Sequence, residues 1–402
     1  MNQAEPFYVL NTESGIYETK TIDIVNGQIK RLQSASDQKA SYYVIPGLID
    51  SHCHINPSYA PLFTAAGITS VRNTAGSFFT LKPLLEAAKQ SASPRVYTTD
   101  RMIDGVPGLW GETSMGSLST NSKEEAIEEV KRQVAIGASF IKVYGRLSRS
   151  VMEAVVRESN QQGLEVSADL LASTDVNALT AAKIGVRYLE HNSGMLQSLV
   201  PGWHCLLSEE EDQAMFTNWD GIAGVEELCA DLKKHDVKLV PTMVLFNQGS
   251  GRDAWKPKWQ FKGPALNGLI GQWDYVRPYV NKSKKERLFI YTSLLTNRYK
   301  EIGGSILAGT DTPAGVDTYP GLSLHRELQL LVKAGFTPFE AIQAATTIPA
   351  REFGMSAELK EGAVADFLVL RADPLTHIEN SQSVEWVVKG GKWYKPEELV
   401  AE

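Results

Sequence analysis

VIPGLIDSHCHINP, residues 44–57, is the stretch that decides the fold of this chain. Its apolar run predicts a buried strand, and the strand ends in His52 and His54. Side chains at positions i and i+2 of a strand point to the same face, so the two imidazoles converge while Cys53 points away. Such a pair can chelate a divalent metal, although histidine pairs also occur in ordinary core packing or on surfaces.

The chain after this strand alternates between predicted helices and short apolar strands. Residues 121–138 begin with the capping-box pattern Ser122-x-x-Glu125 and continue with apolar residues at helical spacing. Similar helix and strand units recur about every 20–30 residues, as far as the late strand SILAGT at residues 305–310. This repetition predicts an α/β fold, a (β/α)₈ TIM barrel with its active site at the C-terminal ends of the strands.

Both ends of the chain are predicted to be β-rich. Asn26-Gly27 and Gly390-Gly391 each lie between strand-like segments, and both dipeptides are typical of two-residue hairpin turns. We therefore expect one small β-sandwich domain to be formed by both termini, residues 1–46 together with 356–402.

The barrel is then expected to occupy residues 47–355. Within it, the segment near 245–300 interrupts the regular alternation and is rich in tryptophan, tyrosine, proline and glycine. We interpret this segment as an aromatic-rich insertion after a strand and as a candidate lid.

The composition excludes several classes of protein. The chain has 402 residues, 43% of them hydrophobic, and a net charge of −7 without a basic stripe, so we expect no nucleic-acid partner. It contains no apolar run of the ~18–20 residues that a membrane helix needs. Three cysteines without a CxxC pair favour a cytoplasmic location. The expected partner is a small-molecule substrate, and homo-oligomerisation stays open.

Ligand-type residues also follow other apolar strands. Lys142 lies in SFIKVY, Asp169 ends LEVSAD, His191 ends RYLEH and Asp311 ends SILAGTD. On a barrel these positions all face one mouth. Any one of them could be a loop residue or a helix cap, but five strand ends with ligand-type side chains together indicate a site.

A resemblance to a known family emerges from these motifs. The chain resembles the metal-dependent amidohydrolase superfamily in the order of six strand motifs, namely PGLIDSHCH, GITSVRN, FIKVY, YLEH, LVPTMV and ILAGTD. It also resembles the C-terminal part of that superfamily in the segments SLHRELQLLVKAGFTPFEAIQAATTIPAREFG and EGAVADFLVLRADPL. Within the superfamily, the chain is most similar to prolidase-like and imidazolonepropionase-like hydrolases. The resemblance covers nearly the whole chain and is weakest across residues 195–300.

The resemblance implies a role for several residues. His52, His54 and Asp311 would bind a first divalent metal, expected to be zinc, with manganese as an alternative. Lys142 would be carboxylated by carbon dioxide and bridge to a second metal, which His191 would bind. Burial lowers a lysine pKa and leaves the neutral amine that captures carbon dioxide.

Asp169 departs from the family pattern, because relatives usually carry a histidine there. An aspartate can bind zinc or manganese through oxygen, so a site with two ions can survive. Alternatively, the second site is weakened or empty, or Asp169 pairs with Lys142, which would then remain an ammonium. We favour Asp169 as a metal ligand.

Three further residues are candidates for substrate binding. Tyr144 shares the inward direction of Lys142 and can hydrogen-bond a substrate carbonyl or carboxylate, although it can equally be a packing aromatic. Arg146 could pair with a substrate carboxylate, or be a solvated loop residue. His325 lies in a helix at a position where relatives often carry a histidine; the alternative is a helix-surface residue.

The expected reaction is hydrolysis of an amide-type C–N bond in a dipeptide, an N-acyl amino acid or a cyclic amide. Asp311 is the expected catalytic residue, taking a proton from the attacking water and passing it to the leaving nitrogen. The altered position at Asp169 leaves a lyase, dehydratase or cyclase as an alternative. A non-enzymatic binding protein is disfavoured, because the other ligand-type residues are all present.

Overall fold

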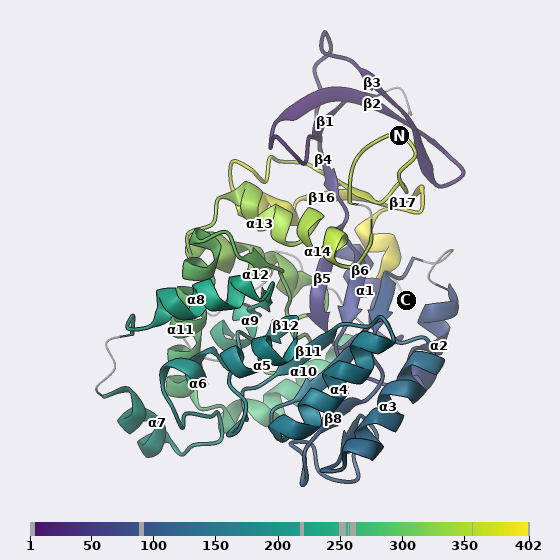
Figure 1. Cartoon of the computed structure of the whole chain (residues 1–402). Helices are drawn as coiled ribbons and strands as arrows, with labels where there is room; N and C mark the ends of the chain where they lie inside the picture. Colours follow the sequence, from purple (N-terminus) through teal and green to yellow (C-terminus); the bar gives the residue numbers. More distant parts are fainter. Residues whose placement is uncertain are drawn as a thin grey trace.

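The computed structural model describes residues 5–87, 92–217, 221–248, 255, 257, 263–355 and 357–400. Figure 1 shows a β-rich part, to which both the N-terminal (purple) and the C-terminal (yellow) segments of the chain contribute, above a larger part of mixed helices and strands. The two parts correspond to separate sheets in the strand pairing, so the sequence-based division into a terminal β structure and a barrel describes the molecule.

The upper part contains one seven-stranded sheet in the order β17-β16-β15-β4-β1-β2-β3. The strands are β1 (Phe7–Leu10), β2 (Tyr17–Val25), β3 (Gln28–Ser34), β4 (Tyr43–Pro46), β15 (Phe367–Leu370), β16 (Val384–Lys389) and β17 (Lys392–Tyr394). Both expected hairpins are confirmed. Asn26 and Gly27 join β2 to β3, Gly390 and Gly391 join β16 to β17, and all four residues have positive φ as these turns require.

This sheet folds back on itself into a small sandwich. The backbone amide of Ala365 donates to the Gly27 carbonyl, and the Gly391 amide donates to the Ala365 carbonyl, so the two hairpin turns lie beside the same residue. Between the layers is an apolar core of Phe7, Val9, Ile22, Ile29, Val44, Ala365, Phe367, Val369 and Val388. The expected β-sandwich is thus confirmed; as its limits we propose residues 1–46 and 356–402.

The lower part is a closed parallel barrel. Its strands in order around the barrel are β5 (Leu48–Cys53), β6 (Ile68–Asn73), β7 (Arg95–Thr98) continued by β8 (Met102–Asp104), β10 (Ile141–Tyr144), β11 (Val166–Asp169), β12 (Tyr188–Glu190), β13 (Lys238–Val240) and β14 (Ser305–Ile306). A short strand, β9 (Ser117–Ser119), pairs with β8.

Backbone hydrogen bonds close the barrel at the two places where regular pairing is interrupted. The Ser51 amide donates to the Ala308 carbonyl at 2.9 Å, which joins the first strand to the last, and the Ser139 amide donates to the Thr98 carbonyl at 2.8 Å. The (β/α)₈ TIM barrel expected from the sequence is therefore confirmed. Because the strands are parallel, their C-terminal ends lie at one mouth.

Helices surround the barrel and connect its strands (Figure 1). They are α1 (Ala60–Ala65), α2 (Phe78–Ala87), α3 (Lys123–Ala135), α4 (Arg149–Gln161), α5 (Ala178–Ile184), α6 (Met195–Leu199), α7 (Glu209–Phe216), α8 (Val225–Lys234), α9 (Met243–Asn247), α10 (Pro264–Val276), α11 (Lys282–Glu301), α12 (Leu322–Lys333), α13 (Pro338–Ala344) and α14 (Thr347–Glu352), with short 3₁₀ turns η1 (Arg277–Tyr279), η2 (Ile378–Gln382) and η3 (Pro396–Leu399). Among the described residues, none of these helices combines the length and apolarity needed to cross a membrane.

The predicted start of α3 is correct in part. The Ser122 hydroxyl caps the helix by accepting from the Glu125 amide, as the capping-box pattern predicts. The Glu125 carboxylate, however, accepts a hydrogen bond from the Thr120 hydroxyl at 2.5 Å. The first turn of α3 is thereby tied to the preceding loop.

The segment near 245–300 differs from the expected insertion. Part of it lies outside the described residues, but its second half is the 20-residue helix α11, which buries Leu288, Thr292, Leu295, Thr296 and Tyr299. These positions have helical spacing, and the Tyr299 hydroxyl donates to the Val237 carbonyl just before β13. α11 is therefore a helix of the barrel, and its regular pattern was obscured by the aromatic residues that precede it.

Candidate metal centre

Two strands bring three ligand-type side chains together at the mouth of the barrel. His52 and His54 lie at the end of β5, and Asp311 follows β14. The Nε2 atoms of both histidines lie 3.0 Å from Oδ1 of Asp311. One ligand atom from each residue lies within 4.8 Å of the others, which is the arrangement that a shared metal ion requires.

A second group lies directly beside the first. His191 follows β12, and its ring centroid is 4.7 Å from that of His52. Its Nε2 lies 3.5 Å from Oδ2 of Asp169 at the end of β11, while its Nδ1 is 2.6 Å from the Thr242 hydroxyl. Asp169 therefore faces His191 rather than pairing with Lys142.

Lys142 on β10 is buried beneath this mouth, with only 1% of its surface exposed. Among the described residues its ammonium makes no ion pair within 4 Å, and it lies 5.4 Å from the centre of the Tyr144 ring. Burial lowers the pKa of Lys142, and the charges of Glu190 and Asp169 only partly oppose this shift. A lowered pKa is the condition for a neutral amine that can react with carbon dioxide.

Behind His52 lies a buried ion pair that the sequence analysis missed. Nδ1 of His52 is 2.5 Å from Oε2 of Glu190, and Oε1 of Glu190 accepts from Nη1 of Arg72 at 2.7 Å. The Arg72 guanidinium lies over the rings of Phe140 and Tyr188, at 3.9 and 4.6 Å from their centres. The sequence feature that could have revealed this ion pair was the presence of one charged residue inside each of two short apolar strands, SVRN and RYLEH.

The acidic groups of the site are held in their charged form. Burial alone would raise the pKa of Asp311, but the charges of His191 and His52 outweigh it and hold the pKa well below its usual range. The pKa of Glu190 is likewise raised by burial but lowered well below its usual range by Arg72 and His52. For Asp169, burial is outweighed mainly by His191, so its pKa is also lowered.

The chemistry of this donor set fits a divalent cation. When Nδ1 of His52 donates its proton to Glu190, Nε2 presents a lone pair toward the Asp311 carboxylate oxygen 3.0 Å away. Two lone pairs that face each other repel unless a positive group lies between them, and this group is either a proton on Nε2, as in the charged imidazole that lowers the pKa of Asp311, or a metal ion in its place. A carboxylate on the far nitrogen is also the usual partner of a metal-binding imidazole, because it sets the tautomer and the ring orientation.

The backbone is strained around these residues. His191, Thr242 and Asp311 have φ values of 61°, 46° and 59°, a left-handed conformation that is uncommon outside glycine. It is least favourable for the β-branched Thr242. Strained positions of this kind cluster at functional sites, because the surrounding structure must hold them in place.

The three residues predicted to bind substrate differ in their position relative to this centre. Tyr144 lies beside Lys142 at the mouth, whereas Arg146 lies in the following turn and donates from Nη1 to the Gly108 carbonyl at 3.0 Å. His325 is placed apart from the site. It is fully buried in α12, with Nε2 2.8 Å from the Ala66 carbonyl and Nδ1 3.0 Å from the Ser381 hydroxyl, so both ring nitrogens already have partners.

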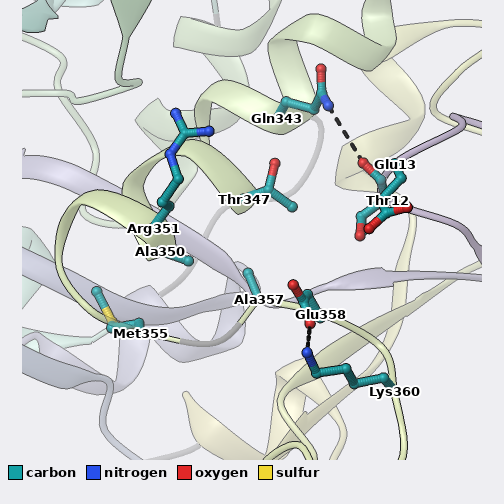
Figure 2. Close-up of a pocket in the computed structure, with 10 residues that line it drawn as sticks. All are labelled: Thr12, Glu13, Gln343, Thr347, Ala350, Arg351, Met355, Ala357, Glu358 and Lys360. Atoms are coloured by element: carbon teal, nitrogen blue, oxygen red, sulfur yellow. Dashed lines mark hydrogen bonds and ion pairs between the residues drawn. The ribbon is translucent and has the colours of Figure 1, made fainter.

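A partly open surface cavity lies elsewhere on the molecule. Its volume is about 510 Å³, and it is lined by residues of α13, α14 and the terminal β structure. Figure 2 shows the Gln343 amide on one wall directed at the Thr12 carbonyl, and Glu358 paired with Lys360 on another. None of its lining residues belongs to the histidine and aspartate groups, so this cavity is separate from the candidate metal centre.

Comparison with known proteins gives independent evidence on what this chain is similar to. The sequence model described as the amidohydrolase family matches residues 292–394. No curated protein matches the chain in sequence at a significant level. Solved structures match over nearly the whole chain.

Three of these similar structures illustrate the likeness. A Xaa-Pro dipeptidase with bound methionine shares 19% identity at a TM-score of 0.68, over 97% of this chain and 99% of that one. A bottromycin amidohydrolase shares 19% at a TM-score of 0.76, over 98% and 87%. An ochratoxinase from A. niger shares 20% at a TM-score of 0.68, over 97% and 95%. The amidohydrolase family model thus matches the C-terminal part of the chain, and the solved structures show that the chain shares its fold with these hydrolases.

Proposed function

We propose that this protein hydrolyses an amide-type C–N bond in a dipeptide, an N-acyl amino acid or a cyclic amide. The observation that carries the proposal is the convergence of His52, His54 and Asp311 at the ends of β5 and β14, within 4.8 Å of one another. The similar structures named as a dipeptidase, an amidohydrolase and an ochratoxinase support the same reaction type. We also propose a cytoplasmic location, which the free cysteines Cys53, Cys205 and Cys229 support.

The residues present fit one or two divalent ions. His52, His54 and Asp311 would hold the first, which we propose to be zinc; His191 and Asp169 would hold a second, with a carboxylated Lys142 between the two. Bound there, a divalent ion lowers the pKa of water toward ~7 and polarises a carbonyl oxygen. The oxygen ligand at Asp169 would make the second position more favourable to manganese than an imidazole would.

We propose that Asp311 carries out the proton transfers and that Tyr144 orients the substrate. Asp311, held ionised by its histidine neighbours, takes the proton from the attacking water and delivers it to the leaving nitrogen. Burial, with the charges of Asp169 and Asp311, raises the pKa of Tyr144. Its phenol therefore keeps its proton and can donate a hydrogen bond to the substrate carbonyl.

The reaction type can be tested directly. Matched N-acetyl amino acids and their C-terminal amides would be incubated with the purified protein in oxygen-18 water. A hydrolase incorporates one labelled oxygen into the released acid. A lyase, dehydratase or cyclase acting on the same substrates would form product without the label, and that result would reject hydrolysis.

We expect the purified protein to carry at least one tightly bound divalent ion. His52→Ala should remove most of it, because one of three converging ligand atoms is lost. Elemental analysis measures the ion per chain, and His377→Ala is the matched control, since His377 is exposed at the start of η2. Equal metal content in both variants, or no metal in the parent even after it is supplied, would contradict the site.

Asp169→His distinguishes one bound ion from two. If Asp169 binds the second ion, the variant should keep two ions per chain and shift its preference from manganese toward zinc. The reason is that an imidazole nitrogen replaces a carboxylate oxygen 3.5 Å from His191. Elemental analysis after growth with each metal provides the measurement. A variant that gains a second ion absent from the parent would show that Asp169 is not a ligand.

A further inference from the structure

Lys285 is a cation beside the candidate metal centre that no assigned role explains. It lies in the first turn of α11, and its side chain reaches back to the loops that follow β13 and β14. Its Nζ donates to the Leu245 carbonyl at 2.9 Å and lies 5.4 Å from the centre of the Phe246 ring. The Phe246 ring in turn meets the ring of His191 edge-on, with centroids 6.3 Å apart.

Lys285 also lies near the loop that carries Asp311. A Cβ built on Gly315, four residues after Asp311, would be 3.9 Å from the Lys285 ammonium. Burial lowers the pKa of Lys285 to about 8, and the charge of Asp311 partly opposes this shift. The Lys285 side chain is half-buried, and its ammonium is mostly protonated at neutral pH and close enough to Asp311 to be affected by its charge.

The positive charge of Lys285 has no counter-ion in the described part of the chain. Among those residues Lys285 forms no ion pair, whereas Arg277 and Arg287 in the same region pair with Asp317 and Asp212. The first turn of a helix is also unfavourable for a cation, because the amide dipoles place partial positive charge there. A half-buried charge at an unfavourable position without a partner is stabilised when a ligand supplies the opposite charge.

We infer that Lys285 binds a carboxylate of the substrate. This rests on the proposed function and narrows it, because dipeptides and N-acyl amino acids carry a free carboxylate whereas their C-terminal amides and simple cyclic amides do not. Arg146, the carboxylate partner expected from the sequence, already donates to the Gly108 carbonyl. Lys285 has only one of its three protons committed to a carbonyl, which leaves two for a ligand.

The test compares matched substrates and matched variants. N-acetyl-L-amino acids and their C-terminal amides would be assayed with the metal-loaded wild type, Lys285→Met and Lys285→Arg. The control is Lys284→Met, because Lys284 lies in the same turn and also donates to a backbone carbonyl, that of Leu207. We expect Lys285→Met to lower kcat/KM for the acids about 10–100-fold, mainly through KM, and to leave the amides unchanged. Lys285→Arg should keep most of the preference for acids, and Lys284→Met all of it.

Two results would overturn the inference while leaving amide hydrolysis intact. One is a wild type that cleaves acids and amides equally well; the other is a Lys285→Met variant that slows both members of each pair to the same extent. If neither the acid nor the amide of any substrate pair is hydrolysed, the proposed function fails. Calorimetric measurement of the binding of the same N-acetyl amino acids then decides whether Lys285 binds a carboxylate. Weaker binding to Lys285→Met than to the wild type supports the carboxylate site, and equal or undetectable binding to both rejects it.

Discussion

Replacing Asp311 by asparagine should lower turnover by at least 10²–10⁴-fold, the typical contribution of one acid–base group. The amide cannot accept the proton of the attacking water, and it removes the negative charge that faces both His52 and His54. The fold should persist, because asparagine tolerates the left-handed backbone of residue 311, where φ is 59°. Steady-state kinetics and circular dichroism would measure the two effects separately.

A matched control is available in the same loop. Asp317 also has a left-handed backbone, with φ of 58°, but its carboxylate pairs with Arg277. Asp317→Asn therefore makes the same chemical change without touching the histidines, and it should keep turnover within a few-fold of the wild type. Near wild-type turnover in Asp311→Asn would remove Asp311 from the mechanism.

The positions of the candidate ligands follow from two simple regularities. Residues i and i+2 of a strand share a face, so His52 and His54 point together, and parallel strands of a barrel end at one mouth, so Asp311 meets them there. Neither step needs knowledge of side-chain packing. The same holds for the hairpins at Asn26-Gly27 and Gly390-Gly391, where the turn chemistry is local.

Other features depend on contacts that no local pattern encodes. Glu190 and Arg72 lie 118 positions apart and meet only inside the closed barrel. Thr242 receives its role from a left-handed backbone and its contact with His191, neither of which LVPTMV indicates. Lys285 is one of three lysines in a four-residue run, and only the folding of α11 against the barrel separates it from Lys282 and Lys284.

The ion pair between Arg72 and Glu190 leads to the second large expected effect. Arg72→Met should lower the free energy of unfolding by about 3–5 kcal/mol, the usual cost of leaving one charge of a buried pair without its partner. Both side chains are at most 1% exposed. Methionine has a similar length and can pack between Phe140 and Tyr188, so the loss would reflect the missing charge rather than a cavity.

Chemical denaturation of two further variants separates the effect of the lost charge from other effects on stability. The double variant Arg72→Met/Glu190→Gln removes both charges while keeping a hydrogen-bond acceptor for His52, so it should be more stable than Arg72→Met alone. Arg149→Met is the control, because its pair with Glu153 is exposed and should contribute less than about 1 kcal/mol. If Arg72→Met were no less stable than this control, the buried pair would contribute nothing beyond a surface pair.

Arg72→Met should also weaken metal binding, although Arg72 contributes no ligand atom. Without the guanidinium, the pKa of the desolvated Glu190 carboxyl rises, because Arg72 is the largest influence that holds it down. A protonated Glu190 would donate to Nδ1 of His52 instead of accepting from it, which moves the imidazole proton to Nε2 and removes the lone pair that faces Asp311. The expected loss in affinity is about 10–100-fold, as is typical when the hydrogen-bond partner of a metal-binding histidine is disturbed. Competition with a chelator measures it, and because protonation of Glu190 is the cause, the loss should shrink as the pH is raised.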